Sequence, residues 1–190
     1  TKALKDQLPF VFTMIKEILT KSNLDDEKRL YEIIAQMKSR LQMVLPSHGH
    51  STAVTRVSSY FSETSDYSDR TGGIAFYRVI ERLERNFQEE KADFIEKLKT
   101  VCEYIFCPEN LMVSVTSGKS AVESLEDQLK VLHSCLKPAK EVKQQEKVQL
   151  LKKNEGFLTS SQVQYVAVAG NFKKAGLDYT GALRVLKVIL

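Results

Sequence analysis

The chain has 190 residues, of which 43% are hydrophobic and 27% are charged. That is enough apolar material to bury a core, and the length suits one domain or slightly more. No apolar run approaches the roughly 20 residues that span a bilayer, and the first residues lack the pattern of a secretory signal. We therefore expect no membrane partner, and a location in the cytoplasm or, in a eukaryote, in an organelle matrix.

The net charge of +4 is concentrated in one segment. Residues 137–153 contain six lysines and two glutamates, and the rest of the chain is balanced. These lysines are not interleaved with aromatic residues or arginines, as a surface that binds nucleic acid requires. We expect a solvated connection and no nucleic-acid partner, with nucleic-acid binding as the remote alternative.

The three cysteines indicate a reducing compartment. An odd count without framework spacing is not typical of a secreted domain held by disulfides. Cys102, Cys107 and Cys135 lie within apolar helical patterns, so we expect buried thiols. The alternative is a metal site shared with a histidine, but Cys102 and Cys107 lack the close spacing of paired metal ligands.

Most of the chain up to Leu136 is predicted to be helical, because apolar residues recur at helical spacing. Pro46 and Gly49 should end or kink one helix, and Gly72 with Gly73 permits a close or left-handed backbone. The polar residues 62–71 are predicted to form turns. The predicted helices cover residues 6–22, 25–45, 51–61, 74–87, 94–105 and 122–136.

Other segments have the composition of strands. Residues 111–116 are rich in β-branched side chains, and residues 155–157 and 163–169 are predicted to form two further strands. The alternation in 163–169 predicts a strand covered on both faces. A last helix, capped by Asp178, should run to the end of the chain. The expected fold class is therefore α+β, mostly helical with a few strands.

The residues that could carry chemistry are few. His48, His50 and His133 are the only histidines, and none of the zinc-peptidase patterns is present. The turn around Gly49 could chelate adventitious nickel or zinc, but it lacks a third ligand and a general base. The Gly-Lys-Ser at 118–120 lacks the earlier glycine of a phosphate loop. We predict no catalytic, cofactor-binding or metal-binding residue in this chain.

An ordered set of short motifs nevertheless resembles one family. Together the motifs extend over nearly the whole chain, and their shared order is similar to that in the presequence-protease-like branch of the pitrilysin/insulinase zinc metallopeptidases. The resemblance falls on the half of those enzymes that carries no zinc. The motifs are at residues 25–30, 38–41, 49–51, 72–74 with 76–77, 110–116, 162–166 with 170–171, and 179–182.

The resemblance implies a parent enzyme of four related α/β domains, paired into two halves around a chamber. Residues 1–136 would be the helical second part of the third domain, 137–153 the lysine-rich connection, and 154–190 the truncated start of the fourth. The predicted strands would belong to helix-backed mixed sheets of the parent. Zinc is implied for the parent and not for this chain, and the implied partners are the remaining domains and an unfolded peptide substrate.

The resemblance thus predicts a non-catalytic structural and chamber-wall segment of a zinc-dependent oligopeptidase that degrades short unstructured peptides. The alternative is a stand-alone helical module for protein–protein interaction without enzymatic activity. That alternative requires a natural chain that ends near residue 190. The start at Thr1 without a methionine and the apolar end at 185–190 lead us to expect a longer parent.

Overall fold

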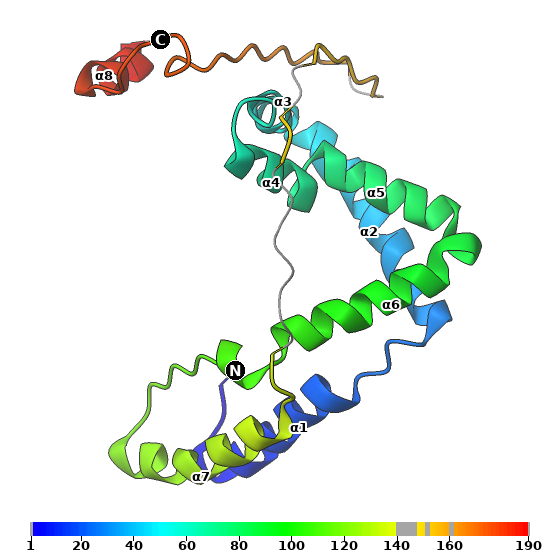
Figure 1. The fold of residues 1–190 in the computed structure, drawn as a ribbon, viewed down its shortest axis with the longest axis vertical. Helices are drawn as coiled ribbons and strands as arrows, with labels where there is room; N and C mark the ends of the chain where they lie inside the picture. Colours follow the sequence, from blue (N-terminus) through cyan, green and yellow to red (C-terminus); the bar gives the residue numbers. More distant parts are fainter. Residues whose placement is uncertain (1, 140–147, 151–152, 160–161, 190) are drawn as a thin grey trace. The chain divides into compact units, whose positions relative to one another are not determined.

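The computed structural model describes residues 2–139, 148–150, 153–159 and 162–189. The chain packs as two compact units, and each is considered by itself. Unit 1 comprises Thr1–Glu32 and Asn86–Gln145, and unit 2 comprises Ile33–Arg85 and Glu146–Leu190. The helices, drawn in Figure 1, are α1 (Leu8–Lys21), α2 (Glu27–Ser47), α3 (Gly49–Ser58), α4 (Glu63–Gly72), α5 (Ile74–Arg85), α6 (Phe87–Ile105), α7 (Lys119–Cys135) and α8 (Gly181–Ile189), with 3-10 turns at Lys5–Gln7 and Pro108–Asn110.

The expected α+β class is wrong for the part of the chain that the structure describes, where the regular elements are all helices. The segments 111–116, 155–157 and 163–169 are extended but form no strand. The predicted cover on both faces of 163–169 is also absent, since Val166 is 77% exposed and Val168 is 93% exposed. β-propensity reflects how well side chains pack on the pleated surface of a sheet. These segments have the composition of strands, but no neighbouring strand pairs with them in the described structure.

Most of the predicted helices are confirmed, with one helix missed. Residues 62–71 were expected to form turns, yet 63–72 form α4. The Oγ of Ser62 accepts a hydrogen bond from the backbone N–H of Ser65 at 3.5 Å, and Glu63 and Asp66 lie in the first turn. These features favour a helix N-terminus, and they could have predicted α4 despite its lack of an apolar stripe. Asp178 is not the cap of α8, which begins only at Gly181.

In unit 1, α1 packs against α7, and the start of α2 packs against α6. Phe87 is only 3% exposed, and its ring centroid lies 5.3 Å from that of Tyr31. Two ion pairs flank this contact, Lys91 with Glu27 and Lys99 with Asp25, both at 2.6 Å. The other buried apolar side chains of the unit are Ile95, Cys107, Leu125 and Leu132.

In unit 2, α4 packs against both α3 and α5. The buried apolar side chains are Ile34 from α2 and Ile80 and Leu83 from α5. Lys38 of α2 and Glu84 of α5 form an ion pair at 3.0 Å. The two helices are therefore joined by charge as well as by apolar packing.

Three further predictions concern the connection, the thiols and the membrane. The lysine-rich connection falls largely on residues 140–147 and 151–152, which lie outside the described residues. Burial is confirmed for Cys107, whereas Cys102 and Cys135 are half-buried. Within the described residues, none of the helices combines the length and the apolar character needed to cross a membrane.

Candidate functional site

The buried carboxylate of Asp69 is the centre of the most elaborate polar site in the structure. Asp69 lies in α4 with 0% of its surface exposed. Its Oδ2 accepts a hydrogen bond from Nη1 of Arg56 at 2.6 Å, and its Oδ1 accepts one from the backbone N–H of Ile74 at 3.0 Å. Asp69 thus binds α3 through the arginine and satisfies a free N–H at the start of α5.

Gly73 allows the close approach that this arrangement needs. A Cβ atom at Gly73 would lie 2.3 Å from Oδ1 of Asp69 and 2.9 Å from its Cα, so no larger residue fits without movement. Gly72, by contrast, has open space around it. The close backbone predicted for the glycine pair is confirmed for Gly73 alone, and it is not left-handed, because φ is −101°.

Arg56 of α3 joins two carboxylates. Besides Asp69, it contacts Oε2 of Glu155, with both Nε and Nη2 at 2.8 Å. Its side chain is 14% exposed. Burial alone would lower the pKa of Arg56. The hydrogen bonds to the two carboxylates together have the larger effect, so the pKa of Arg56 is raised. Arg56 is therefore a permanent cation that organises the site.

Glu155 comes from the extended segment 153–159, which we call the strap. The hydroxyl of Tyr60 donates a hydrogen bond to Oε2 of Glu155, and Nη1 of Arg78 lies 3.8 Å from Oε1. The guanidinium of Arg78 also lies 5.1 Å from the ring centroid of Phe157 in the strap. Two cations and a phenol therefore hold the strap against α3 and α5.

The strap contacts change how Glu155 and Tyr60 titrate. Burial would raise the pKa of Glu155, but the hydrogen bonds from Tyr60 and Arg56 and the positive charge of Arg56 and Arg78 keep that pKa below its usual value. Burial and the hydrogen bond to Glu155 raise the pKa of Tyr60, and the charge of Arg56 offsets only part of this. Glu155 is thus ionised, and Tyr60 neutral, near neutral pH.

A groove of about 1080 Å³ lies beside this cluster in unit 2. Residues of α2, α3 and α5 line one side, and the strap with residues 162–167 lines the other. Tyr165 lies so close to Gly49 that a Cβ atom there would be 2.3 Å from the tyrosine ring. The Gly49 motif of the sequence therefore serves packing against Tyr165.

The histidines of that motif are not brought together as metal ligands. Nδ1 of His48 lies 3.0 Å from Oγ of Ser47 and 3.2 Å from the carbonyl oxygen of Val44, so it takes part in the end of α2. The ring of His50 lies 6.3 Å from the ring of Tyr165. In the parts of the chain that are described, no three His, Cys, Asp or Glu side chains are grouped to hold a metal ion. These residues do not fit a zinc site.

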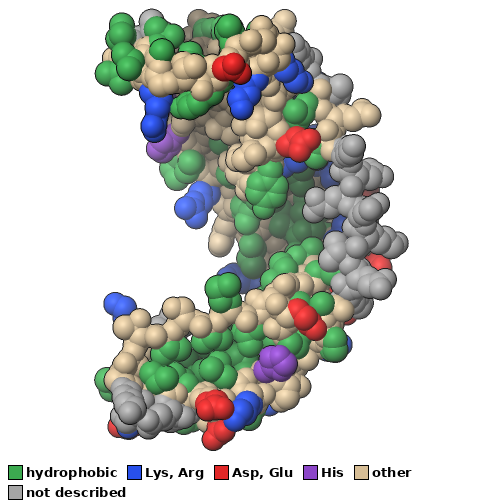
Figure 2. All heavy atoms as spheres, turned by 60° about the vertical axis from the view of Figure 1, so that its left-hand side comes forward, with side chains coloured by type: hydrophobic (Ala, Val, Ile, Leu, Met, Phe, Trp, Pro, Cys, Tyr) green, Lys and Arg blue, Asp and Glu red, His purple; other side chains and the backbone are tan. Residues whose placement is uncertain are grey.

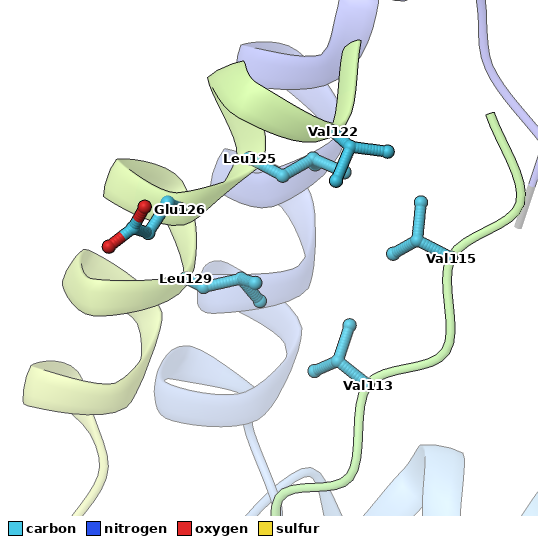
Figure 3. A pocket seen from close by; sticks show the side chains of 6 residues that line it. All are labelled: Val113, Val115, Val122, Leu125, Glu126 and Leu129. Atoms are coloured by element: carbon cyan, nitrogen blue, oxygen red, sulfur yellow. The ribbon is translucent and has the colours of Figure 1, made fainter. Parts of the chain in front are cut away.

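A second, apolar cavity of about 430 Å³ lies in unit 1 (Figure 3). Val113 and Val115 of the extended segment 111–118 face Val122, Leu125 and Leu129 of α7 across it, with Glu126 at its edge. Figure 2 shows hydrophobic side chains gathered over the α1 and α7 part of this unit. Its described lining is apolar apart from the carboxylate of Glu126.

Neither the Arg56 cluster nor the groove could be assembled from the sequence alone, because Glu155 lies far from Arg56 along the chain. The one available signal was the pair Gly72 and Gly73, directly after Thr71, which indicated a close backbone approach. The cluster is a neutralised set of two cations and two anions. Its chemistry is that of a structural joint.

Comparisons with known proteins point to one family. The model of the region associated with peptidases of family M16, subfamily C, matches residues 1–83. Protein HypA of Clostridium perfringens (strain 13 / Type A) is 32% identical over 189 residues, which cover 100% of this chain and 19% of that protein. No solved structure is a significant match.

Two further relatives carry the name of a peptidase. Presequence protease 1, chloroplastic/mitochondrial, of Arabidopsis thaliana is 20% identical over 97% of this chain and 17% of its own length. Presequence protease, mitochondrial, of Yarrowia lipolytica (strain CLIB 122 / E 150) is 26% identical over 62% of this chain and 12% of its own. The chain therefore spans less than a fifth of the length of the relatives it matches.

In unit 2, the buried ion cluster joins α3, α4 and α5. The matches confirm the resemblance drawn from the sequence motifs. The matches support a pitrilysin-family fragment from the C-terminal half, similar to the presequence-protease-like branch.

Proposed function

We propose that this chain is a non-catalytic structural and chamber-wall segment of a zinc-dependent oligopeptidase that degrades short unstructured peptides. The observation that carries the proposal is the match of at least 97% of the chain to two relatives more than five times as long, one of which is named a presequence protease. A second protein of that name matches 62% of the chain. The Arg56 cluster supports it, because a neutralised joint suits a wall that must keep its shape.

In this proposal the zinc is held elsewhere in the parent, since the described residues do not group as metal ligands. The proposed partners are the remaining domains of the parent and the unfolded peptide that it cleaves. Residues 1–136 would be the helical second part of the third domain, and 154–190 the start of the fourth. The proposed location is the cytoplasm or an organelle matrix.

The test is a peptide-degradation assay on the natural full-length protein and on the 190-residue chain in parallel. We expect the full-length protein to cleave a short unstructured peptide, to lose that activity with a chelator and to regain it with zinc. The 190-residue chain should be inert with or without zinc. Zinc-dependent cleavage by the 190-residue chain would overturn the non-catalytic role, and an inactive full-length protein would overturn the peptidase.

The alternative function is a stand-alone helical interaction module. The apolar cavity between α7 and the valines at 113 and 115 is the observation that favours it, because such a surface suits an apolar partner. The size of the natural polypeptide separates the two functions. A natural polypeptide of about 21.6 kDa would support the stand-alone interaction module, and a much heavier polypeptide would support the peptidase segment.

A further inference from the structure

We propose that Glu155 is a latch that fastens the strap, and that release of this one carboxylate opens the groove in unit 2. The proposal concerns a conformational device and goes beyond the chamber-wall function. It follows from an asymmetry in the Arg56 cluster. One of the two carboxylates on Arg56 belongs to a helix, and the other belongs to an extended segment.

Asp69 is the fixed partner of Arg56. It is fully buried in α4, it also accepts the hydrogen bond from the N–H of Ile74, and Gly73 packs directly on it. Moving Asp69 would therefore break the junction between α4 and α5 as well as an ion pair. The Asp69 contact stays in place whenever unit 2 is folded.

Glu155 is the releasable partner. Its side chain is 17% exposed, and the residues around it in the strap are more open, with Leu158 fully exposed and Phe157 40% exposed. When Glu155 leaves, Arg56 keeps its 2.6 Å contact with Asp69. The charge of Arg56 is thus never left buried without a partner, which is the costly situation for a broken ion pair. The strap can detach without unfolding the helices.

The groups that face Glu155 come from three places. Arg56 belongs to α3, Tyr60 follows α3, and Arg78 belongs to α5 and also lies against the ring of Phe157. Each of them favours the ionised carboxylate. The docking of the strap therefore depends on the negative charge of Glu155.

Detachment of the strap would open the groove because the strap is one of its walls. Residues 153–159 face the residues of α2, α3 and α5 across the 1080 Å³ space. Without this wall, Tyr60 and Tyr77 on the opposite side become accessible from the strap side. The latch thus determines whether unit 2 presents an enclosed groove or an open helical face.

Limited digestion of the natural full-length protein with chymotrypsin tests the latch. Docking holds the ring of Phe157 against the guanidinium of Arg78, so we expect cleavage after Phe157 to be much faster from the detached strap. The cleavage rate then follows the detached fraction when reattachment is fast. Glu155→Gln removes the charge and keeps the shape. We expect cleavage after Phe157 to be at least about tenfold faster in this variant, since a hydrogen bond to a charged group is lost.

Two further variants keep the test decisive. Tyr60→Phe removes one hydrogen bond to Glu155 and retains the ring, so cleavage after Phe157 should rise several-fold. Glu96→Gln, at an exposed position of α6 in unit 1, is the matched control and should leave the rate unchanged. Tyr67 of α4 does not line the groove, so cleavage after Tyr67 reports unfolding of the helices and should not change in any variant.

The proposal is overturned if Glu155→Gln is cleaved after Phe157 at the wild-type rate. It is also overturned if cleavage after Tyr67 rises in step in both Glu155→Gln and Tyr60→Phe, because the strap would then open only with the helices. Failure of the peptidase function would appear in the zinc-dependent assay and would not affect these cleavage rates. The two proposals can therefore fail independently.

Discussion

Asp69→Asn should leave one buried hydrogen-bond donor of unit 2 without its acceptor. The asparagine keeps the size of the side chain, but its amide has one acceptor where the carboxylate has two. Asp69 uses one oxygen for Arg56 and the other for the N–H of Ile74, at 2.6 Å and 3.0 Å. The amide nitrogen must therefore face one of these two donors. A buried donor is left unsatisfied whichever way the amide is turned.

The magnitude follows from burial. Asp69 has no exposed surface and Arg56 is 14% exposed, so water cannot replace the lost bond. A hydrogen bond to a charged group contributes about 1.5–3 kcal/mol, which corresponds to about a 10- to 150-fold change in an opening equilibrium. Arg56 retains Glu155, so the full cost of an isolated buried charge is not expected.

Hydrogen exchange read by mass spectrometry in the natural full-length protein is the assay, because it reports local opening in a large protein. Amides of α4 and α5 should exchange about 10- to 150-fold faster in Asp69→Asn. Asp93→Asn is the control, since its ion pair with Lys97 is exposed and should contribute at most about 1 kcal/mol. An increase below about threefold in α4 and α5 would refute the role given to Asp69.

Three further predictions address packing and pH. Gly73→Ala should lower the thermal midpoint, at a cost of about 1–3 kcal/mol, because its Cβ would meet Asp69, whereas Gly72→Ala should leave the midpoint within a degree or two. Phe87→Ala should destabilise unit 1 by about 3–5 kcal/mol, measured by hydrogen exchange of α6, and a cost below about 1 kcal/mol would contradict its place in the core. The pKa of Glu155 is lowered on docking although burial opposes this, so its stabilisation is present above pH 4.5 and is lost as the pH falls through the lowered pKa. The pKa of Tyr60 is raised, chiefly by burial, so its contribution is present below pH 10.0 and is lost as the pH rises through the raised pKa. An NMR titration of the Nε–H of Arg56, which contacts Glu155, should show the strap most fully docked between these two transitions.

Helices with an apolar stripe could be predicted from the sequence. In α5, Ile80 and Leu83 recur at helical spacing and are buried as that spacing requires. The same reasoning missed α4, because its only buried residue is the charged Asp69. A helix held by a buried ion pair has no hydrophobic periodicity to detect.

The extended segments show the opposite error. Val113 and Val115 have the composition of a strand, yet the segment runs alongside α7 and forms no ladder in the described structure. Local composition fixes the preference of the backbone, but pairing depends on neighbours that a single segment does not specify. Of the candidate site, only the close approach at Gly73 could be anticipated. The pairing of Arg56 with Glu155 joins distant parts of the chain and carries no local signal.

The central claim is that this chain is one part of a much larger peptidase of the pitrilysin family. An immunoblot of the source cells with an antibody raised against the 190-residue chain tests it most directly. We predict a band about five times heavier than 21.6 kDa, because the chain covers 19% of its relative in Clostridium perfringens. A band near 21.6 kDa would contradict the claim and would favour the stand-alone interaction module.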